Sequence, residues 1–396
     1  MDIQKRGLIT LIKSAFKCEK YELPPSFDVV EALRTAEKQN IVTMVYSGIH
    51  NCGFDVKSDK IKNAFSSVCK SILVNETQNY NLSVIENAFE KNGIDYMLLK
   101  GARLKKSYPK SEMRSMGDID ILIKLEQYAK IKQIMNELGY FEKQESDHEL
   151  IWEKENLVVE LHKRVIPSYN KDYFAYFEDG WKFAVATEEG KKHSYLMNKN
   201  DEFIYLFIHF CKHFRDSGVG IKHLIDLWHY RQINADLDEI YILEKLKELK
   251  VDEFYQNVLR TIDCLFNEKD SDEKVELITD VIFCEGKFNA SQARVLSASL
   301  KKFKQGENVK KQKIKRCFNS IFVPFKVMCG QYRFLKKAPF LLPFMWVFHL
   351  FKRLFTKGRL KKYNREIAEI NKENVSKYQR YLNCVGLDYN FDEQKD

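Results

Sequence analysis

The chain has 396 residues, more than one compact core commonly uses, so we expect two or three domains. Apolar residues make up 44% and charged residues 31%, which is typical of globular proteins and excludes wholesale disorder. The net charge is +9, but 18 basic residues and one acidic residue between Lys301 and Lys362 give that segment +17 and leave the rest slightly acidic. This distribution argues against a uniformly basic nucleic-acid-binding chain.

The cysteines and the N-terminus bear on the compartment. The nine cysteines include no CxxC pair of the zinc or thioredoxin type. The N-terminal sequence MDIQKRGLITLIKSAF lacks a long apolar core followed by a small-residue cleavage site. No run of 18 apolar residues predicts a conventional membrane-spanning helix. We therefore expect a protein of the reducing cytoplasm.

An N-terminal helical region is predicted over residues 1–76. Residues 29–46 have apolar positions near a period of 3.6 and contain no proline, which predicts one continuous helix. Residues 78–91 predict a further amphipathic helix, with Thr77 available as its N-cap and Asn92-Gly93 as its C-terminal stop.

Residues 77–200 predict a small mixed α/β domain, because the apolar period changes there. The expected elements are a buried strand at 94–99, a short helix at 101–108, a half-buried strand at 118–123, a helix at 126–138 and a hairpin of 150–153 with 157–162. Helices return at 201–215, 221–233, 240–266 and 270–283. We therefore expect a helical domain over 201–300 and a basic, partly apolar helical region over 301–396.

The segment DIDILI carries the most informative acids. Asp118 and Asp120 are two residues apart on a predicted strand, so both carboxylates point to the same face. Like charges that share a pocket repel unless a cation lies between them, and carboxylate oxygens suit Mg²⁺ or Mn²⁺. Glu160 in VVELH is placed to add a third acid from an adjacent strand, as a two-metal site requires. A solvated strand face is the alternative interpretation of a DxD pair alone.

Phosphate binding is indicated upstream of these acids. Lys100-Gly101 lies between a predicted strand and a predicted helix, where glycine allows close approach of a ligand and the helix N-terminus favours an anion. Basic residues surround this turn, among them Arg114, which could contact phosphate or lock the loop before the strand. A phosphate cradle, metal-binding carboxylates and a third acid together indicate nucleotidyl transfer.

These motifs resemble a known family. Lys100-Gly101, Tyr108-Pro109, Arg114, Asp118-Ile119-Asp120 and Glu160-Leu161-His162 are similar in order to the nucleotidyltransferase-like proteins of the DNA polymerase β superfamily. Within it they resemble the bacterial branch found in polysaccharide and natural-product gene clusters. The resemblance extends to His209, His213 and the IKHLIDLW segment, and to FLKKAPFLLPFMW near the C-terminus.

The resemblance implies an α+β fold, a polymerase-β-type nucleotidyltransferase domain with a small mixed sheet between helical regions. It implies Mg²⁺-dependent transfer of a nucleoside monophosphate from an NTP, with ATP the expected donor, to an unidentified acceptor hydroxyl. Asp118, Asp120 and Glu160 would be catalytic and bind metal, while Lys100, Gly101, Arg114 and His162 would bind substrate. Ala102 stands where the superfamily usually has serine or glycine, so a catalytically weak nucleotide-binding scaffold at the membrane surface is the alternative.

The histidines have competing interpretations. His209 and His213 have the four-residue spacing of helical zinc ligands, and His223 with Asp226 could complete a metal site. The alternative is that these residues pack the helical domain against the catalytic one, with a histidine lining the nucleotide cleft. His148 and His162 bracket the predicted hairpin, so either could act as a base near the metals or serve as a hydrogen-bonded structural histidine.

The basic region contains an apolar stretch. Residues 338–351 (APFLLPFMWVFHLF) are uncharged and lie between Lys336-Lys337 and Lys352-Arg353. The stretch is too short to span a bilayer, and Pro339 and Pro343 confine a helix to its later part. We expect either peripheral association of 301–362 with the anionic inner face of the membrane or a helix docked on the protein. No recognised nucleic-acid-binding motif accompanies the basic residues.

Overall fold

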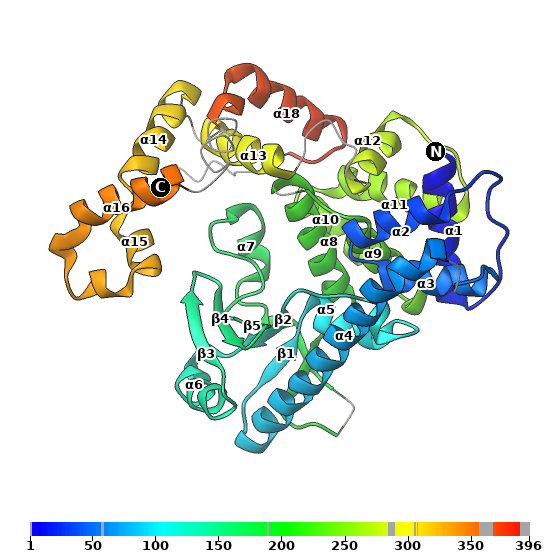
Figure 1. Cartoon of the computed structure of the whole chain (residues 1–396), viewed down its shortest axis with the longest axis horizontal. Helices are drawn as coiled ribbons and strands as arrows, with labels where there is room; N and C mark the ends of the chain where they lie inside the picture. The colour runs from blue at the N-terminus through cyan, green and yellow to red at the C-terminus, as the bar shows by residue number, and fades with distance from the viewer. Residues whose placement is uncertain are drawn as a thin grey trace. The chain divides into compact units, whose positions relative to one another are not determined.

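A computed structural model describes residues 2–56, 59–187, 190–216, 218–283, 290–304, 306, 308–355 and 367–388 (Figure 1). The chain divides into two compact units, which are described separately below. The first unit comprises Met1–Phe210 and Gly220–Thr279, and the second comprises Cys211–Val219 and Asp280–Asp396. No helix among the described residues is long and apolar enough to cross a membrane.

Four helices open the first unit: α1 (Ile3–Lys17), α2 (Val29–Lys38), α3 (Val42–Asn51) and α4 (Asp59–Asn92). The single helix predicted over residues 29–46 is wrong, because Asn40 adopts a left-handed φ of 56° and separates α2 from α3. The predicted N-cap at Thr77 is also wrong. Thr77 lies inside α4, where its hydroxyl donates a hydrogen bond to the carbonyl of Leu73 at 2.9 Å.

A seven-stranded mixed sheet follows, in the order β3-β4-β5-β2-β1-β7-β6. Its strands are β1 (Tyr96–Leu98), β2 (Ile119–Ile123), β3 (Phe141–Glu145), β4 (Glu149–Lys154), β5 (Leu157–His162), β6 (Ala184–Ala186) and β7 (Ser194–Met197). The predictions of β1, of β2 and of the β4–β5 hairpin are confirmed. β3, β6 and β7 were not predicted from the sequence. β2 pairs antiparallel with β1 and parallel with β5.

One face of the sheet is buried against two helices, α4 and α6 (Tyr128–Glu137). Alternate residues of β2 and β5 contribute to this core, including Ile121 and Leu161, and meet Phe89 of α4. Because side chains alternate along a strand, the residues between them are directed to the other face of the sheet. Asp120 and Glu160 are among those residues, so the fold sets them on the face opposite α4 and α6.

The remaining helices of the first unit complete its fold. They are α5 (Lys100–Leu104), α7 (Lys171–Phe177), α8 (Lys199–Asp216, which continues into the second unit), α9 (Ile221–Ile233), α10 (Glu239–Glu248), α11 (Asp252–Asn267) and α12 (Glu273–Ile282, whose last residues lie in the second unit). The helix predicted over 221–233 matches α9. The one predicted over 240–266 is divided into α10 and α11 at Lys250, which has a left-handed φ of 56°.

The second unit is helical in the part that the structure describes. Its further helices are α13 (Ala290–Lys304), α14 (Val309–Ile321), α15 (Phe325–Gln331), α16 (Leu342–Phe355) and α18 (Lys372–Cys384). The predicted domain boundaries at 76/77, 200/201 and 300/301 fall inside α4, α8 and α13. Part of the predicted basic region, at residues 305, 307 and 356–366, lies outside the described residues.

Candidate active site

The parallel pairing of β2 with β5 brings two of the predicted acids together. Asp120 stands directly opposite Glu160 in the register of the two strands. Asp118, half-buried, precedes β2 and lies two residues before Asp120. Ligand atoms of Asp120, Glu160 and His162 all lie within 4.8 Å of one another. The structure therefore brings Asp120 and Glu160 together, with Asp118 two residues upstream of Asp120.

Asp120 is the most fully paired of the acids. Its Oδ1 accepts a hydrogen bond from Lys100 Nζ at 2.7 Å and lies 2.7 Å from His162 Nε2. Burial alone would raise the pKa of Asp120, but the Lys100 ammonium and the His162 ring hold it well below its usual range. The carboxylate in turn raises the pKa of Lys100, although burial opposes this. Asp120 is therefore ionised and fixed in place.

His162 is 1% exposed, and its protonation state follows from its contacts. Burial and the neighbouring Lys100 charge lower its pKa, so the ring is neutral at neutral pH. An ionised Asp120 can only accept, which places the single ring proton on Nε2. The other nitrogen, Nδ1, is buried and has no hydrogen-bond partner among the described residues. The ring is thus placed to orient Asp120, and its burial argues against the predicted direct contact with substrate.

Glu160 lacks such compensation. Burial and the charges of Asp118 and Asp120 raise its pKa to about 8, and burial with the Asp120 charge also raises the pKa of Asp118. At neutral pH the ligand-free site therefore keeps a proton where the acids converge. Three carboxyls supply hard oxygen donors, so these residues fit Mg²⁺ or Mn²⁺, which would replace that proton.

Two residues near the acids were missed by the sequence analysis. Glu149 of β4 stands opposite His162, pairs with His148 at 2.8 Å, and its charge adds to the upward shift in the pKa of Glu160. The alternation of ELIWEK could have predicted its orientation. Tyr205 of α8 has a buried hydroxyl without a hydrogen-bond partner among the described residues, and burial together with the Asp120 charge raises its pKa. Nothing distinguishes it in the sequence from the other tyrosines.

Packing against the loop before β2 shapes the turn from β1 to α5. Lys100 has a left-handed φ of 46°, an unfavourable conformation for a residue with a side chain. A Cβ at Gly101 would lie 3.0 Å from Cβ of Met116, so the loop before β2 is a reason for glycine here. Ala102 is fully buried in the core, so a hydroxyl at this position would lie in the core. The departure at Ala102 therefore does not remove a group that faces the acids.

Arg114 holds the loop before β2 to helix α9. Its Nε and Nη2 donate to the two carboxylate oxygens of Asp226 at 2.6 and 2.7 Å, and Nη1 donates to the carbonyl of Ser115. The Tyr108 hydroxyl donates to the same carboxylate at 2.6 Å. All three side chains are buried. Of the two predicted roles for Arg114, the structure supports locking of the loop; its buried donors are not available to phosphate.

A further lysine of α9 lies by this loop. The Lys222 ammonium donates to the carbonyl of Ser115 at 3.3 Å, and burial together with the Arg114 charge lowers its pKa to about 8. The charges of Asp118 and Asp120 act in the opposite direction. Lys222 thus adds a cation beside the acids, and the sequence analysis did not select it.

A cavity of about 430 Å³ adjoins the loop before β2. Most of its lining residues are of polar types, and they come from the end of α2, the start of α3, α4 and the loop: Glu37, Asn40, Val42, Ser67, Lys70, Ser71, Val74, Asn75, Gln78, Ser115 and Met116. Met116 is two residues before Asp118, so their Cα atoms are at most about 7 Å apart. Asn75 is 3% exposed, and its Oδ1 has no partner among the described residues.

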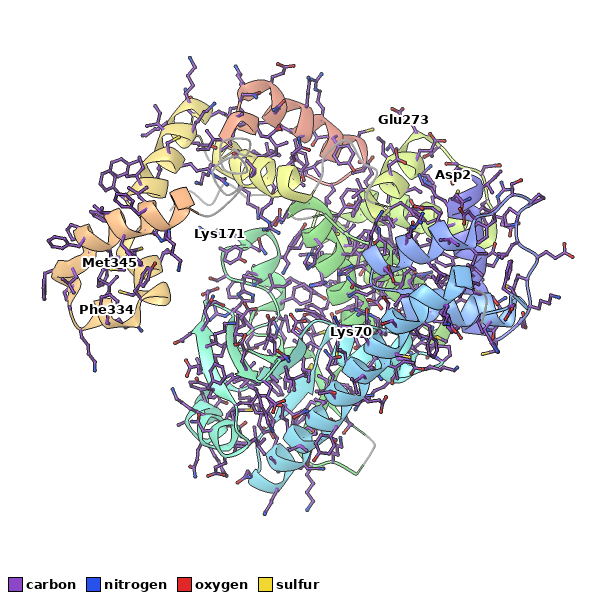
Figure 2. All side chains as sticks on the ribbon, viewed as in Figure 1. Asp2, Lys70, Lys171, Glu273, Phe334 and Met345 are labelled. Atoms are coloured by element: carbon purple, nitrogen blue, oxygen red, sulfur yellow. The ribbon has the colours of Figure 1, made fainter. Side chains whose placement is uncertain are left out.

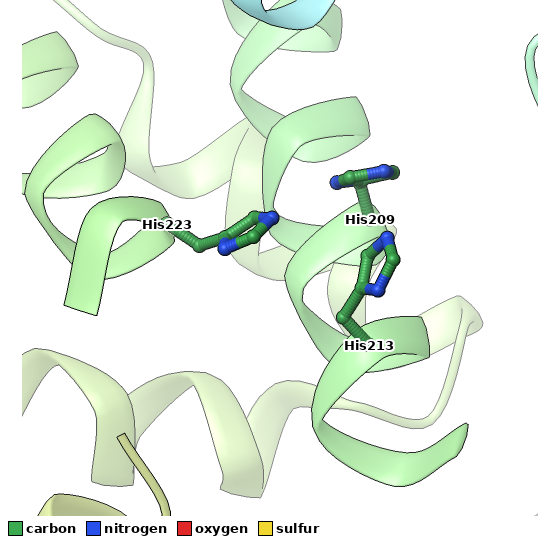
Figure 3. A group of neighbouring side chains, drawn as sticks. All are labelled: His209, His213 and His223. Atoms are coloured by element: carbon green, nitrogen blue, oxygen red, sulfur yellow. The ribbon is translucent and has the colours of Figure 1, made fainter. Parts of the chain in front are cut away.

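The predicted histidine pair on α8 has a third neighbour. His209 and His213 lie one turn apart on this continuous helix, and the ring of His223 from α9 stacks on that of His209 with centroids 5.7 Å apart (Figure 3). Ring nitrogens of the three lie within 4.8 Å of one another. Asp226, which the spacing had grouped with them, is instead bound to Arg114. Imidazole nitrogens bind transition metals in preference to Mg²⁺, whereas carboxylate oxygens such as those on the sheet suit Mg²⁺.

The chain has an α+β fold in which Lys100, Asp120 and Glu160 gather at one face of a mixed sheet. The family described as uncharacterised nucleotidyltransferase matches residues 25–267, more than half of the chain, and the chain belongs to this family. The expected nucleotidyltransferase fold is thereby confirmed, whereas the link to polysaccharide and natural-product gene clusters stays a prediction. No curated protein and no solved structure matches the chain.

The buried ion pair of Arg114 with Asp226 predicts a large effect on stability. Asp226→Ala should lower the free energy of unfolding by about 3–5 kcal/mol, because it leaves a buried guanidinium without its partner. Arg114→Ala combined with Asp226→Ala should cost less than the sum of the two single changes. Urea unfolding measures both. Arg34→Gln removes an exposed ion pair with Glu31 and should cost at most about 1 kcal/mol. Equal losses in Asp226→Ala and Arg34→Gln would contradict the assignment.

Proposed function

We propose that the protein transfers a nucleoside monophosphate from an NTP, with ATP the expected donor, to a hydroxyl group of an acceptor in a metal-dependent reaction. The observation that carries this proposal is the strand register that sets Asp120 opposite Glu160, with Asp118 two residues upstream. The raised pKa of Glu160 supports it, because a proton held among converging acids marks a place for a cation. Membership of a nucleotidyltransferase family supports the reaction class.

Asp118, Asp120 and Glu160 would hold Mg²⁺ or Mn²⁺, which would neutralise negative charge on the phosphate oxygens during transfer. His162 acts as a positioning residue, since its Nε2–H holds the Asp120 carboxylate ionised and oriented. A bound metal would displace the proton of Glu160, so this carboxylate would be ionised during transfer.

Two lysines would bind the triphosphate. The ammonium of Lys100 pairs with Asp120 in the ligand-free chain and can instead contact a phosphate oxygen when a metal ion satisfies that carboxylate. Lys222 donates a hydrogen bond to the carbonyl of Ser115 in the loop that precedes Asp118, and its lowered pKa would let it donate a proton to departing pyrophosphate. The acceptor hydroxyl would attack the α-phosphorus in line, and the bond to the bridging oxygen of pyrophosphate would break.

The polar cavity beside Ser115 and Met116 is our candidate for the acceptor site. Its hydroxyl, amide and ammonium groups suit an acceptor rich in hydroxyl groups. The loop that forms one wall leads directly into Asp118 and Asp120. Met116 in this wall lies within about 7 Å of Asp118 between Cα atoms, and this proximity is the reason for the assignment.

Labelling tests the reaction. The wild-type protein, incubated with each α-labelled NTP, Mg²⁺ or Mn²⁺ and cell extract, should label a product. Asp120→Asn and Glu160→Gln should each lower the labelling rate by roughly a hundredfold or more, because metal and phosphate lose an anionic ligand. Glu126→Gln changes an exposed acid that lies outside the site and should label normally. Nucleotide binding without any labelling by the wild type would favour the scaffold alternative.

Metal affinity should depend on pH through Glu160. Below a pKa of about 8 the metal must displace the Glu160 proton, so the apparent affinity for Mn²⁺ should fall as the pH is lowered and level off above pH 8. The slope below the pKa should approach tenfold per pH unit. Mn²⁺ titration followed by electron paramagnetic resonance measures this. Glu160→Gln should bind more weakly and with a flatter profile; an unchanged slope in this variant would exclude Glu160 as the group responsible.

Filling the cavity should separate acceptor use from nucleotide binding. Ser71 lines the cavity from α4, and Ser71→Trp should lower product labelling about tenfold or more by excluding the acceptor, while nucleotide affinity stays within about twofold of the wild type. Ser66→Trp is the matched control, because Ser66 lies on the same helix outside the lining. Normal labelling by Ser71→Trp would remove this cavity as the acceptor site.

A further inference from the structure

Exposed apolar side chains concentrate in one part of the second unit. Half of the large apolar side chains that are exposed in the described chain lie between residues 303 and 351. This segment carries α14, α15 and α16, and Figure 2 marks it with Phe334 and Met345. It lies beyond residue 267, where the match to the nucleotidyltransferase family ends. The family resemblance therefore does not account for it.

The first apolar stripe follows α16. Phe340, Phe344, Val347 and Phe348 are 74%, 72%, 54% and 54% exposed. The three that belong to the helix are spaced by three and one residues and therefore lie along one face. Phe340 lies in the turn just before the helix. The opposite face of α16 is used inside the protein, where Met345 and Trp346 pack on the small core around Met328 and Leu335. The exposed side chains of the stripe are therefore not part of this small core.

The second apolar stripe follows α14. Ile314, Phe318, Ile321 and Phe322 have the same spacing and are 70%, 58%, 42% and 40% exposed. Around them the helix is basic, with exposed Lys310 and Lys311 in its first turns and half-buried Lys313 and Arg316 further on. The helix thus combines an apolar stripe with a basic remainder.

The two stripes belong to one folded segment. The Phe322 ring lies edge-on to Trp346 with centroids 5.2 Å apart. The Trp346 indole donates a hydrogen bond to the carbonyl of Val323 at 2.8 Å. These contacts join the end of α14 to the inner face of α16, so the apolar stripes are presented by packed helices.

We propose that these two stripes, on α14 and α16, dock the protein on the surface of an anionic lipid bilayer. Short helices with exposed aromatic residues on one face and lysines beside them are suited to lie in the interface, with rings among the acyl chains and ammonium groups at the headgroups. The 18 basic residues and one acidic residue between 301 and 362 supply the complementary charge. No described helix can cross a bilayer, which fits binding at its surface.

Other occupants fit less well. A second copy would bring two segments of net charge +17 together, and their repulsion opposes association through this surface. Nucleic acid would match the charge but not the exposed phenylalanines and isoleucines, which offer no contacts to a phosphate backbone. An anionic bilayer satisfies both the charge and the apolar surface. This proposal does not depend on nucleotidyl transfer.

Vesicle flotation of the full chain without nucleotide tests the proposal. The wild type should float with vesicles of phosphatidylcholine mixed with phosphatidylserine, and should neither float with phosphatidylcholine alone nor stay bound in high salt. Phe344→Ser combined with Phe348→Ser should lower the bound-to-free ratio about tenfold or more, because two buried rings are lost. Lys310→Glu combined with Lys311→Glu should lower it by a similar factor.

The matched control is Ile240→Ser, because Ile240 in the first unit is 73% exposed, close to Phe344. It should float as the wild type does. All the changed side chains are exposed, so the midpoints of unfolding should not move. The charge variant and the salt series test membrane binding independently of the phenylalanines. The proposal is overturned if the wild type stays unbound on anionic vesicles, or if both patch variants float normally. It is also overturned if the Phe344 variant abolishes self-association in place of flotation.

Discussion

Repulsion among carboxyl groups on neighbouring strands is the constraint on which the rest of the site depends. The parallel register of β2 and β5 fixes Asp120 against Glu160, and the core beneath them leaves no freedom for either strand to slide. Lys100 and His162 stabilise the negative charge of Asp120. Glu160 and Asp118 lack comparable partners, and their pKa values are raised. The fold therefore keeps these carboxyl groups close together at one place, and in the proposed function a cation would relieve their repulsion.

A second interaction keeps this arrangement in place from outside the sheet. The loop that leads into β2 is held by side chains that lie outside the sheet. Arg114 fixes it to α9 through a two-pronged contact with Asp226, and Tyr108 adds a hydrogen bond to the same carboxylate. The helices after the sheet thus serve the site: α9 supplies both the anchor of the loop and Lys222, and α8 supplies Tyr205.

Much of this could be predicted from sequence because the relevant signals are local. The alternation in DIDILI and VVELH predicted both strands and the grouping of Asp120 with Glu160 on one face. Left-handed residues that are not glycine, such as Asn40 and Lys250, gave no comparable signal, so two pairs of helices were each predicted as one. Pairings between distant segments also escaped prediction: nothing in the sequence near Arg114 indicates Asp226 as its partner, and the short strands β6 and β7 lack a periodic pattern.

Helix α4 contributes both to the cavity and to the core beneath the sheet. Its 34 residues extend about 51 Å. Side chains between Ser67 and Gln78 line the cavity, and side chains between Leu82 and Phe89 pack against the sheet that carries the acids. Because both sets of side chains belong to one rigid element, the distance from the cavity wall to the sheet is set by helical geometry and not by a flexible connection. A kink introduced between them, for instance by proline, would misalign these two parts without altering any residue in either.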